Sequence, residues 1–226
     1  MACVFVTGGT GYVGSRLVPL LSERGHSVRA LARHGSESKL PPGCTRVTGN
    51  ALDPATFADQ VAPADTFVQL VGVAHPAPSK AEQFKSIDLT SIRASVQSAV
   101  SARIGHFIYI SVAHPAPIMH SYIAVRSEGE ALIRASGLKA TILRPWYVLG
   151  PGHRWPLFLL PAYWLLERLP STRESARRLG LVTLSQMIAA LVEAVESPAR
   201  DVTVIEVAQI RRARLPDRIK ATAVPV

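Results

Sequence analysis

Residues 4–14 read VFVTGGTGYVG, and this stretch decides the fold. An apolar run of β-branched and aromatic residues stops at a cluster of glycines. Apolar residues at helical spacing then follow at Leu17, Val18, Leu20 and Leu21. The order of strand, glycine turn and helix is typical of a turn that binds a dinucleotide. A plain structural turn is the alternative interpretation of these glycines.

The glycines of this turn have different predicted tasks. Gly8 lets the backbone turn sharply off the strand, and Gly14 lets the helix pack closely on the sheet. Because Gly11 has no Cβ, a pyrophosphate can approach the main chain there. The start of the helix offers unpaired N–H groups and a positive dipole end to the phosphates. The predicted cofactor-binding residues of this turn are Gly8, Thr10, Gly11, Tyr12, Val13 and Gly14.

The length of 226 residues and the 48% hydrophobic content allow one large α/β domain or two small ones. The first strand begins almost at Met1, so we expect no signal peptide. No run reaches the roughly 18 apolar residues that cross a bilayer. We therefore expect a cytoplasmic protein. Cys3 and Cys44 would lie on strands separated by a third strand, too far apart for a disulfide, and are expected to be free thiols.

The formal net charge of +9 suggests an anionic partner. Nucleic acid, an anionic membrane surface and an anionic ligand are the three classes to consider. The basic residues are mostly arginines spread along the chain, with no lysine-rich run, no basic patch interleaved with aromatic residues and no zinc spacing. We therefore expect no nucleic-acid partner and no metal site. A polyanionic cofactor explains part of the charge.

Strand and helix patterns alternate along the chain. The expected strands begin at 4 and continue at 27–32, 44–48, 66–71, 106–110, 139–143 and 201–207. The expected helices are 13–24, 80–103, 120–136 and 183–197, the last with Thr183 as N-cap. Such alternation predicts the α/β class, a Rossmann-type doubly wound parallel sheet with right-handed crossovers.

The alternation of strand and helix patterns changes beyond Pro145. Residues 155–169 are apolar and aromatic but contain two prolines. We expect a small C-terminal substrate lobe, mainly from 150–182, within one NAD(P)-binding domain over 1–210. A basic tail over 211–226 follows.

The second predicted strand ends at Arg33. Sites that prefer NAD usually place an acidic residue here, which binds the ribose 2′-hydroxyl. A guanidinium can instead pair bidentately with a 2′-phosphate. The sequence therefore favours NADP(H) over NAD(H), with Arg29 and His34 placed to assist. A solvated surface arginine is the alternative.

The loop after the third strand contains Leu52 and Asp53. The carboxylate of Asp53 can accept a hydrogen bond from the exocyclic amine of adenine, or it can cap a helix that begins at Pro54. The two interpretations stay open.

The loop after the fourth strand begins with Val71, Gly72 and Val73, small residues that let the backbone approach a cofactor. His75 in the same loop is either a general acid–base group or a structural histidine.

Ser111, Tyr122 and Arg126 form a candidate catalytic group. Ser111 ends the fifth strand, and the other two stand at i and i+4 on the next helix, so they share a face. A positive charge beside a phenol is expected to lower its pKa from about 10. Such a tyrosine can exchange a proton with a carbonyl oxygen that Ser111 steadies. The alternative is an ordinary amphipathic helix.

Taken together, these motifs resemble the atypical and extended branches of the short-chain dehydrogenase/reductase superfamily. The match covers about residues 2–207 and is most similar to the NAD(P)H-binding group that resembles the 39 kDa accessory subunit of respiratory complex I. The residues that carry it are the glycine turn 7–14, Arg33, Leu52-Asp53, Ser111, Tyr122-x-x-x-Arg126 and the segment 143–152, LRPWYVLGPG.

The resemblance implies that Pro145 to Val148 line the nicotinamide side of a cofactor site, with Tyr122 and Arg126 beside them. Arg126 departs from the family pattern, which has a lysine that also binds the nicotinamide ribose. Arginine keeps the charge but not the shape of lysine. Whether this replacement leaves catalysis intact stays open.

Two functions follow from the sequence. The first is an NADPH-dependent oxidoreductase or epimerase that acts on an apolar or lipid-like carbonyl compound. The second is a non-catalytic NADPH-binding redox sensor or accessory subunit. The segment 155–168 has three interpretations: a lid over an apolar substrate, ordinary core, or an interfacial anchor that contacts a membrane peripherally.

Overall fold

The computed structural model describes residues 1–151, 174 and 178–215 of the chain. Its strands are β1 (Cys3–Thr7), β2 (Ser27–Ala32), β3 (Thr45–Thr48), β4 (Thr66–Gln69), β5 (His106–Ile110), β6 (Ala140–Arg144), β7 (Tyr147–Leu149), β8 (Leu181–Thr183) and β9 (Val202–Glu206). Its α-helices are α1 (Gly14–Glu23), α2 (Ala81–Gln83), α3 (Thr90–Ser101), α4 (His120–Ala135), α7 (Leu184–Glu196) and α8 (Val207–Ile210). Most of the predicted substrate lobe and the end of the basic tail lie outside these residues.

Seven of the described strands form one parallel sheet in the order β3-β2-β1-β4-β5-β6-β9. The predicted doubly wound α/β architecture is confirmed. The direction of strand order reverses between β1 and β4, and a crevice at the carboxyl ends of such strands is where open α/β sheets bind ligands. The sheet topology thus places any ligand site beside the glycine turn.

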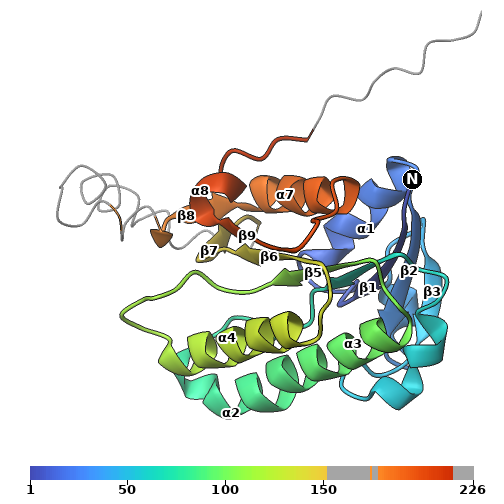
Figure 1. Cartoon of the computed structure of the whole chain (residues 1–226), viewed down its shortest axis with the longest axis horizontal. Coiled ribbons are helices and arrows are strands. Elements are labelled where there is room, and N and C mark those ends of the chain that lie inside the picture. The colour runs from blue at the N-terminus through green and yellow to red at the C-terminus, as the bar shows by residue number, and fades with distance from the viewer. Residues whose placement is uncertain (152–173, 175–177, 216–226) are drawn as a thin grey trace, which may run out of the picture.

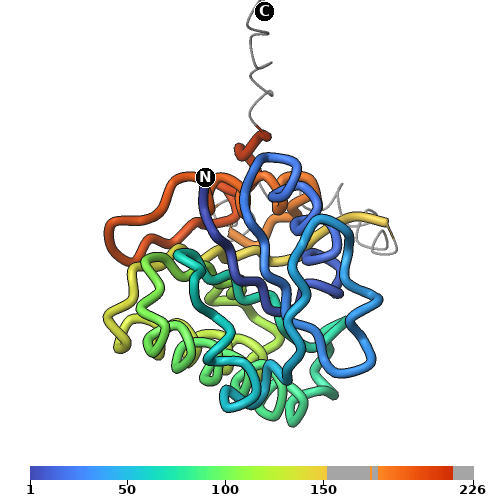
Figure 2. Tube along the Cα trace, turned by 90° about the vertical axis from the view of Figure 1, so that its right-hand side faces the viewer, coloured from blue at the N-terminus to red at the C-terminus, as the bar shows by residue number. Residues whose placement is uncertain are grey.

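The sheet is covered on both faces. Figure 1 shows α1, α7 and α8 on one face and α2, α3 and α4 on the other. The view turned by 90° in Figure 2 shows the same layers, with α7 in orange above the sheet and α3 and α4 in green below it. Both faces of β4 are therefore buried, which explains why its sequence lacks polar–apolar alternation.

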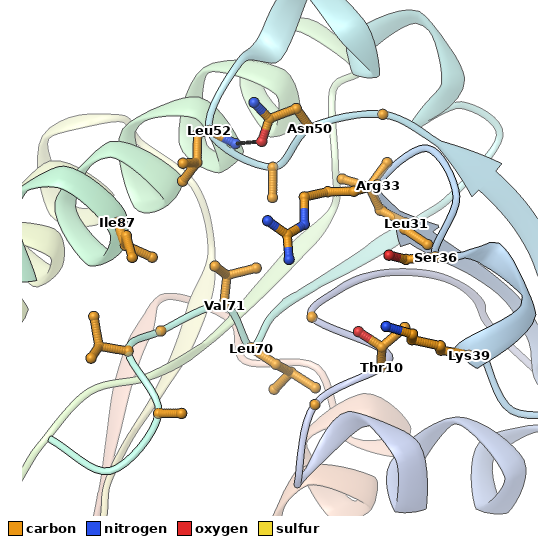
Figure 3. Close-up of a pocket in the computed structure, with 18 of the residues that line it drawn as sticks. Thr10, Leu31, Arg33, Ser36, Lys39, Asn50, Leu52, Leu70, Val71 and Ile87 are labelled. Carbon is orange, nitrogen blue, oxygen red and sulfur yellow. Dashed lines mark hydrogen bonds between the residues drawn. The ribbon is translucent and has the colours of Figure 1, made fainter. Parts of the chain in front are cut away.

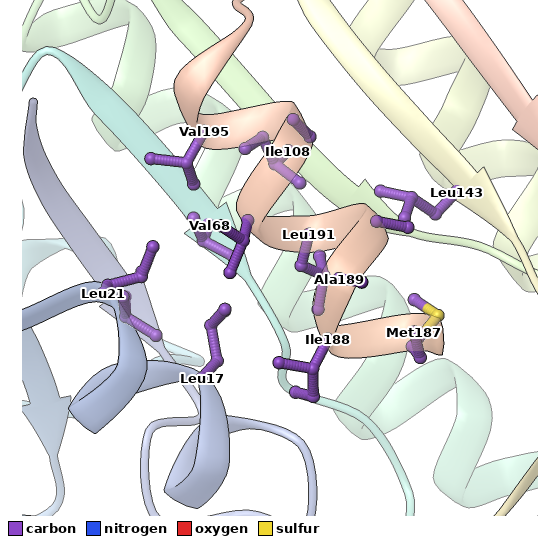
Figure 4. Close-up of a cluster of buried hydrophobic side chains, with 14 of the residues drawn as sticks. Leu17, Leu21, Val68, Ile108, Leu143, Met187, Ile188, Ala189, Leu191 and Val195 are labelled. Carbon is purple, nitrogen blue, oxygen red and sulfur yellow. The ribbon is translucent and has the colours of Figure 1, made fainter. Parts of the chain in front are cut away.

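Two hydrophobic clusters fill the spaces between the layers. One lies under α1 and α7, where Leu17, Leu21 and Leu191 pack over Val68 and Ile108 of the sheet (Figure 4). The other lies under α3 and α4 and contains a row of aromatic rings along the sheet, Phe5, Phe67 and Phe107, with centroids 5.2 Å apart in each adjacent pair. This packing fixes the strand ends from which the site is built.

The structure refines several predicted elements. The capping role of Thr183 is confirmed, because its side chain accepts from Gln186 N at 3.2 Å and the Gln186 side chain bonds back to Thr183 N at 2.8 Å. The helix expected over 80–103 is instead interrupted by a π-helical turn, Phe84–Leu89. The parallel pair β7 and β8 was not predicted. In the described part of the chain, no helix is long and apolar enough to span a bilayer.

Candidate functional site

The glycine turn joins β1 to α1 in a conformation that explains two of its glycines. Gly8 has a φ of +77°, and a Cβ there would lie 2.8 Å from the carbonyl carbon of Leu70. The turn is closed by a hydrogen bond from Gly11 N to Gly8 O at 3.0 Å. A Cβ on Gly14 would lie 2.7 Å from Gly9 Cα, so Gly14 packs the helix against the turn itself and not, as predicted, against the sheet.

A pocket of about 540 Å³ opens at the carboxyl ends of β1, β2 and β4 (Figure 3). Its walls come from the glycine turn, the loops after β2, β3 and β4, and the helical segment that begins near Lys80. This is the crevice that the sheet topology predicts. The predicted cofactor-binding residues that line it are Gly8, Thr10, Gly11, Arg33, Leu52, Val71, Gly72 and Val73.

Other lining residues were not predicted from the sequence. Ser36 and Lys39 follow Arg33 in the loop after β2, and Asn50 precedes Leu52. The remaining unpredicted contributors include Lys80, Gln83 and Ile87. Ile87 belongs to the π-helical turn, whose position could not be read from periodicity. The polar spacing of Arg33, Ser36 and Lys39 is the signal that could have identified Ser36 and Lys39.

The charge of the pocket wall has one sign. Arg33, Lys39 and Lys80 line it, and none of the described lining residues is acidic. Arg33 is exposed, and among the described residues its guanidinium makes no hydrogen bond or ion pair. In Figure 3 this guanidinium lies between Leu52 and Val71. The pocket is therefore suited to an anion.

Eight predicted cofactor-binding residues lie outside the pocket lining: Tyr12, Val13, Gly14, Asp53, Tyr122, Arg126, Pro145 and Val148. The Asp53 side chain accepts from Ala55 N at 3.1 Å and caps a 3-10 turn, Pro54–Thr56. Of the two interpretations of Asp53, this contact is the one in which the carboxylate caps a helical turn. Contact of Asp53 with adenine stays a prediction. Arg29 is also turned elsewhere and donates to Gln60 O at 3.1 Å.

Tyr122 and Arg126 lie together on α4, as their spacing predicts. The Arg126 Cζ is 5.1 Å from the centroid of the Tyr122 ring. Arg126 is buried, donates from Nη1 to Ile110 O at 2.8 Å, and forms an ion pair from Nη2 to Asp88 Oδ1 at 2.5 Å. The Tyr122 ring packs on Phe84 with centroids 4.9 Å apart.

The expected lowering of the Tyr122 pKa is wrong. Burial raises the pKa of this phenol above its ordinary value, Arg126 offsets part of the change, and Asp88 opposes Arg126. The sequence spacing revealed the arginine but neither the burial nor the carboxylate. Tyr122 is consequently a protonated phenol at neutral pH, able to donate a proton.

Ser111 lies at the end of β5 but has a partner that the sequence did not predict. Its hydroxyl donates to Glu130 Oε1 at 2.6 Å. The Glu130 carboxylate also accepts from Arg144 Nε at 2.8 Å and pairs with His114 at 3.6 Å. Burial acts to raise the pKa of Glu130, but Arg144 and Ser111 more than offset it, so the pKa lies below its ordinary value.

The remaining predicted residues lie nearby in the fold. His75 is exposed in the loop after β4 with a φ of +50°. Pro145 follows β6, where its carbonyl accepts from Ala113 N at 2.9 Å, and Val148 lies in β7, paired with Val182 of β8. Their place beside the nicotinamide stays a prediction. The segment 155–168 lies outside the described residues, so its three interpretations remain predictions.

Comparison with known proteins agrees with this geometry. A family model described as NAD(P)H-binding matches residues 8–152. The ceramide reductase of Caulobacter vibrioides is 26% identical over 211 residues, covering 92% of this chain and 65% of that protein. The chain thus spans less than two thirds of the length of this curated relative.

Two solved structures share the fold. The Bordetella bronchiseptica enzyme WbmH in complex with NAD+ superposes with a TM-score of 0.68 at 22% identity, covering 91% of this chain and 75% of that one. A short-chain dehydrogenase/reductase superfamily protein from Agrobacterium tumefaciens with bound NAD gives 0.65 at 17% identity, covering 92% and 80%. The narrower likeness to the complex I accessory subunit stays a prediction. The match over 8–152, the glycine turn and the sheet order together show that this chain belongs to the NAD(P)H-binding family and is an atypical short-chain dehydrogenase/reductase.

Proposed function

We propose that this chain binds NADP(H) in the pocket at the β1–β4 switch point and, with Tyr122 as proton donor, reduces the carbonyl group of an apolar or lipid-like substrate. The observation that carries the proposal is the charge of the pocket wall. Arg33, Lys39 and Lys80 line it without an acidic neighbour among the described lining residues. A dinucleotide with a third phosphate group suits such a wall better than one without it.

The preference for NADP(H) over NAD(H) rests on the loop after β2. An acidic residue at this place would bind a ribose 2′-hydroxyl and repel a 2′-phosphate. Here Arg33 follows the strand directly, and Ser36 and Lys39 of the same loop also line the pocket. A guanidinium, a hydroxyl and an ammonium group together can donate several charge-assisted hydrogen bonds to a phosphate.

The rest of the pocket fits the other parts of a dinucleotide. The glycine turn at Gly8 and Gly11 brings main chain to the start of α1, where a pyrophosphate is stabilised. Leu52, Val71 and Ile87 offer apolar side chains for an adenine ring. Asp53, Tyr12, Val13 and Gly14 would support this site from outside its lining.

The proposed chemistry divides between cofactor and protein. When bound, NADPH supplies a hydride. Tyr122 holds the proton that the reduced oxygen needs, and its raised pKa keeps that proton in place at neutral pH. Pro145 and Val148 would line the nicotinamide side, and Ser111 would lie close to the reacting oxygen.

The substrate class follows from the apolar segment 155–166 and from a relative. That segment reads WPLFLLPAYWLL and contains the aromatic residues Trp155, Phe158, Tyr163 and Trp164 among leucines. The Caulobacter relative is named a ceramide reductase, and ceramide is a lipid. Because this chain spans 65% of that protein, a lipid-like carbonyl substrate is proposed here as a class only.

A second function, a non-catalytic NADPH-binding sensor or accessory subunit, is favoured by one specific observation. The two polar groups that would assist Tyr122 are both engaged inside the protein. Ser111 donates its proton to Glu130, and Arg126 is paired with Asp88. A protein that binds the nucleotide but has no turnover would match this arrangement.

Calorimetric titration with NADPH and NADH tests the cofactor proposal. We expect the wild type to bind NADPH more tightly and Arg33→Ala to lose about 1.5–3 kcal/mol of that preference, the range for a hydrogen bond to a charged group. Arg29→Ala is the matched control, because it removes the same charge from the same strand while Arg29 donates to Gln60 O outside the pocket. Equal affinity of the wild type for both nucleotides would contradict the preference.

A further inference from the structure

Asp88 joins the nucleotide pocket to the helix that carries Tyr122. Its Oδ2 accepts from Val73 N at 2.9 Å, and Val73 lines the pocket. Its Oδ1 accepts from Arg126 Nη2 at 2.5 Å. Asp88 is 1% exposed, so both contacts are made away from water. One buried carboxylate therefore holds the pocket wall and the catalytic helix at the same time.

Both terminal nitrogens of Arg126 are engaged inside the protein. Besides Asp88, its guanidinium donates to the carbonyl of Ile110 at the end of β5, and its Nε is buried without a partner among the described residues. A Cβ on Gly72 would overlap the guanidinium, so the loop after β4 passes directly over it. The guanidinium therefore lies behind the pocket wall at Gly72, and contacts the carboxylate instead of projecting into the pocket.

The π-helical turn Phe84–Leu89 supplies one contact to Tyr122 and another to Arg126. Phe84 packs on the Tyr122 ring, while Asp88 holds the guanidinium that lies 5.1 Å from that ring. Ile87 of the same turn lines the pocket. A π-helical turn inside a helix often marks a functional position, because it shifts the side chains that follow.

We propose that Asp88 is a positioning residue that couples occupancy of the nucleotide pocket to the position of Tyr122, with Arg126 as the link. A nucleotide that presses on the loop 70–73 moves the Val73 amide, the carboxylate follows, and the guanidinium beside the phenol follows in turn. Arg126 thus acts through Tyr122 and not as a cofactor ligand. This inference rests on the proposed function, since it takes the pocket as the nucleotide site and Tyr122 as the proton donor.

Fluorine NMR on protein labelled with 3-fluorotyrosine tests the coupling, with Tyr122→Phe to assign the Tyr122 resonance. Without nucleotide, Asp88→Asn is expected to move this resonance and to speed amide exchange in the segment 70–73. On saturation with NADPH, the wild type is expected to show a further shift of the Tyr122 resonance. Asp88→Asn should lose most of that shift while its Kd for NADPH rises about tenfold or less.

Glu128→Gln is the matched control, because it removes an ion pair with Arg93 on the exposed face of the same helix. It should leave the Tyr122 resonance and its response to NADPH unchanged. Arg126→Lys keeps a positive charge beside Asp88 and should retain a shift of the Tyr122 resonance on NADPH binding. If Asp88→Asn does not fold, the double variant Asp88→Asn with Arg126→Gln replaces it, since that protein contains no unpaired buried charge.

The two proposals fail in different ways. A wild type that does not bind NADPH contradicts the proposed function, while the comparison without nucleotide still decides whether Asp88 holds Tyr122 and the pocket wall. An Asp88→Asn protein that keeps the wild-type Tyr122 resonance and wild-type exchange over 70–73 overturns the coupling. An equal NADPH-induced shift in both proteins overturns it as well.

Discussion

The hydroxyl of Ser111 donates to Glu130 at 2.6 Å, and both residues are almost completely buried. The same carboxylate accepts from Nε and Nη2 of Arg144, at 2.8 and 2.5 Å. Arg144 also pairs with Glu206 at 3.0 Å. These contacts join the carboxyl ends of β5, β6 and β9 to α4. Glu130 is therefore the centre of a network that connects these three strand ends to α4.

Replacing this carboxylate should be costly to the fold. Glu130→Gln leaves Arg144 partly unpaired in a buried place, and we expect a loss of about 3 kcal/mol in the free energy of unfolding. Glu128→Gln, two residues away on the exposed face of α4, should change it by about 0.5 kcal/mol or less. Urea unfolding of the two variants measures the difference. Equal losses would contradict the assignment of Glu130 as a buried network centre.

His106 predicts a dependence of stability on pH. It is 2% exposed, its Nε2 lies 2.9 Å from Thr141 Oγ1, and burial lowers its pKa to about 4. Because the folded-state pKa lies below the unfolded value of about 6.5, the unfolded chain takes up the proton first. The contribution of the neutral His106 to the free energy of unfolding is fully present above pH 6.5. It is lost as the pH falls toward 4, and the loss is up to about 3 kcal/mol.

Urea unfolding at pH 7, 5.5 and 4.5 measures this loss. His106→Gln should flatten the decline between pH 6.5 and 4.5, because the titrating group is gone. His34→Gln is the control, since the His34 side chain is 98% exposed. If the His34 and His106 variants follow the same curve as the wild type, the decline has another cause.

How far the sequence predicts the site depends on the distance along the chain over which each feature is encoded. The turn at Gly8 and the end of β2 just before Arg33 were predicted because backbone conformation and strand boundaries are local. Asp88 pairs with Arg126 across 38 positions, and Ser111 with Glu130 across 19. Neither pair has a spacing that a helix or strand period would reveal.

The same limit explains the error on Tyr122. Spacing on one helix revealed the charge of Arg126, whose effect is to lower the Tyr122 pKa. The opposing effects, burial and the carboxylate of Asp88, arise from packing between α4 and the π-helical turn. The pair β7 and β8 escaped prediction for a related reason, since each strand is three residues long.

Gly11 tests where the nucleotide lies. A Cβ there would meet only Gly8 O, at 3.2 Å, so we expect a side chain to fit after a small shift of the turn. Because Gly11 lines the pocket, Gly11→Val should abolish NADPH binding in a protein that still folds. Gly105→Val, at an exposed glycine outside this pocket lining, is the matched control. Calorimetry with unchanged NADPH affinity in Gly11→Val would place the nucleotide elsewhere.

Tyr122 tests the chemistry. Burial keeps its phenol protonated at neutral pH, so Tyr122→Phe removes the proposed proton donor while the ring can still pack on Phe84. We expect turnover to fall by about 10²-fold or more, the usual scale for loss of general acid catalysis. The Kd for NADPH should stay nearly unchanged, because Tyr122 does not line the described pocket.

The measurement is steady-state NADPH oxidation across a panel of apolar aldehydes, ketones and quinones. Glu128→Gln, on the exposed face of the same helix, is the control and should keep most of the activity. Turnover that survives Tyr122→Phe intact would exclude Tyr122 as the donor, whereas a wild type that binds NADPH but reduces none of these compounds would favour the non-catalytic alternative.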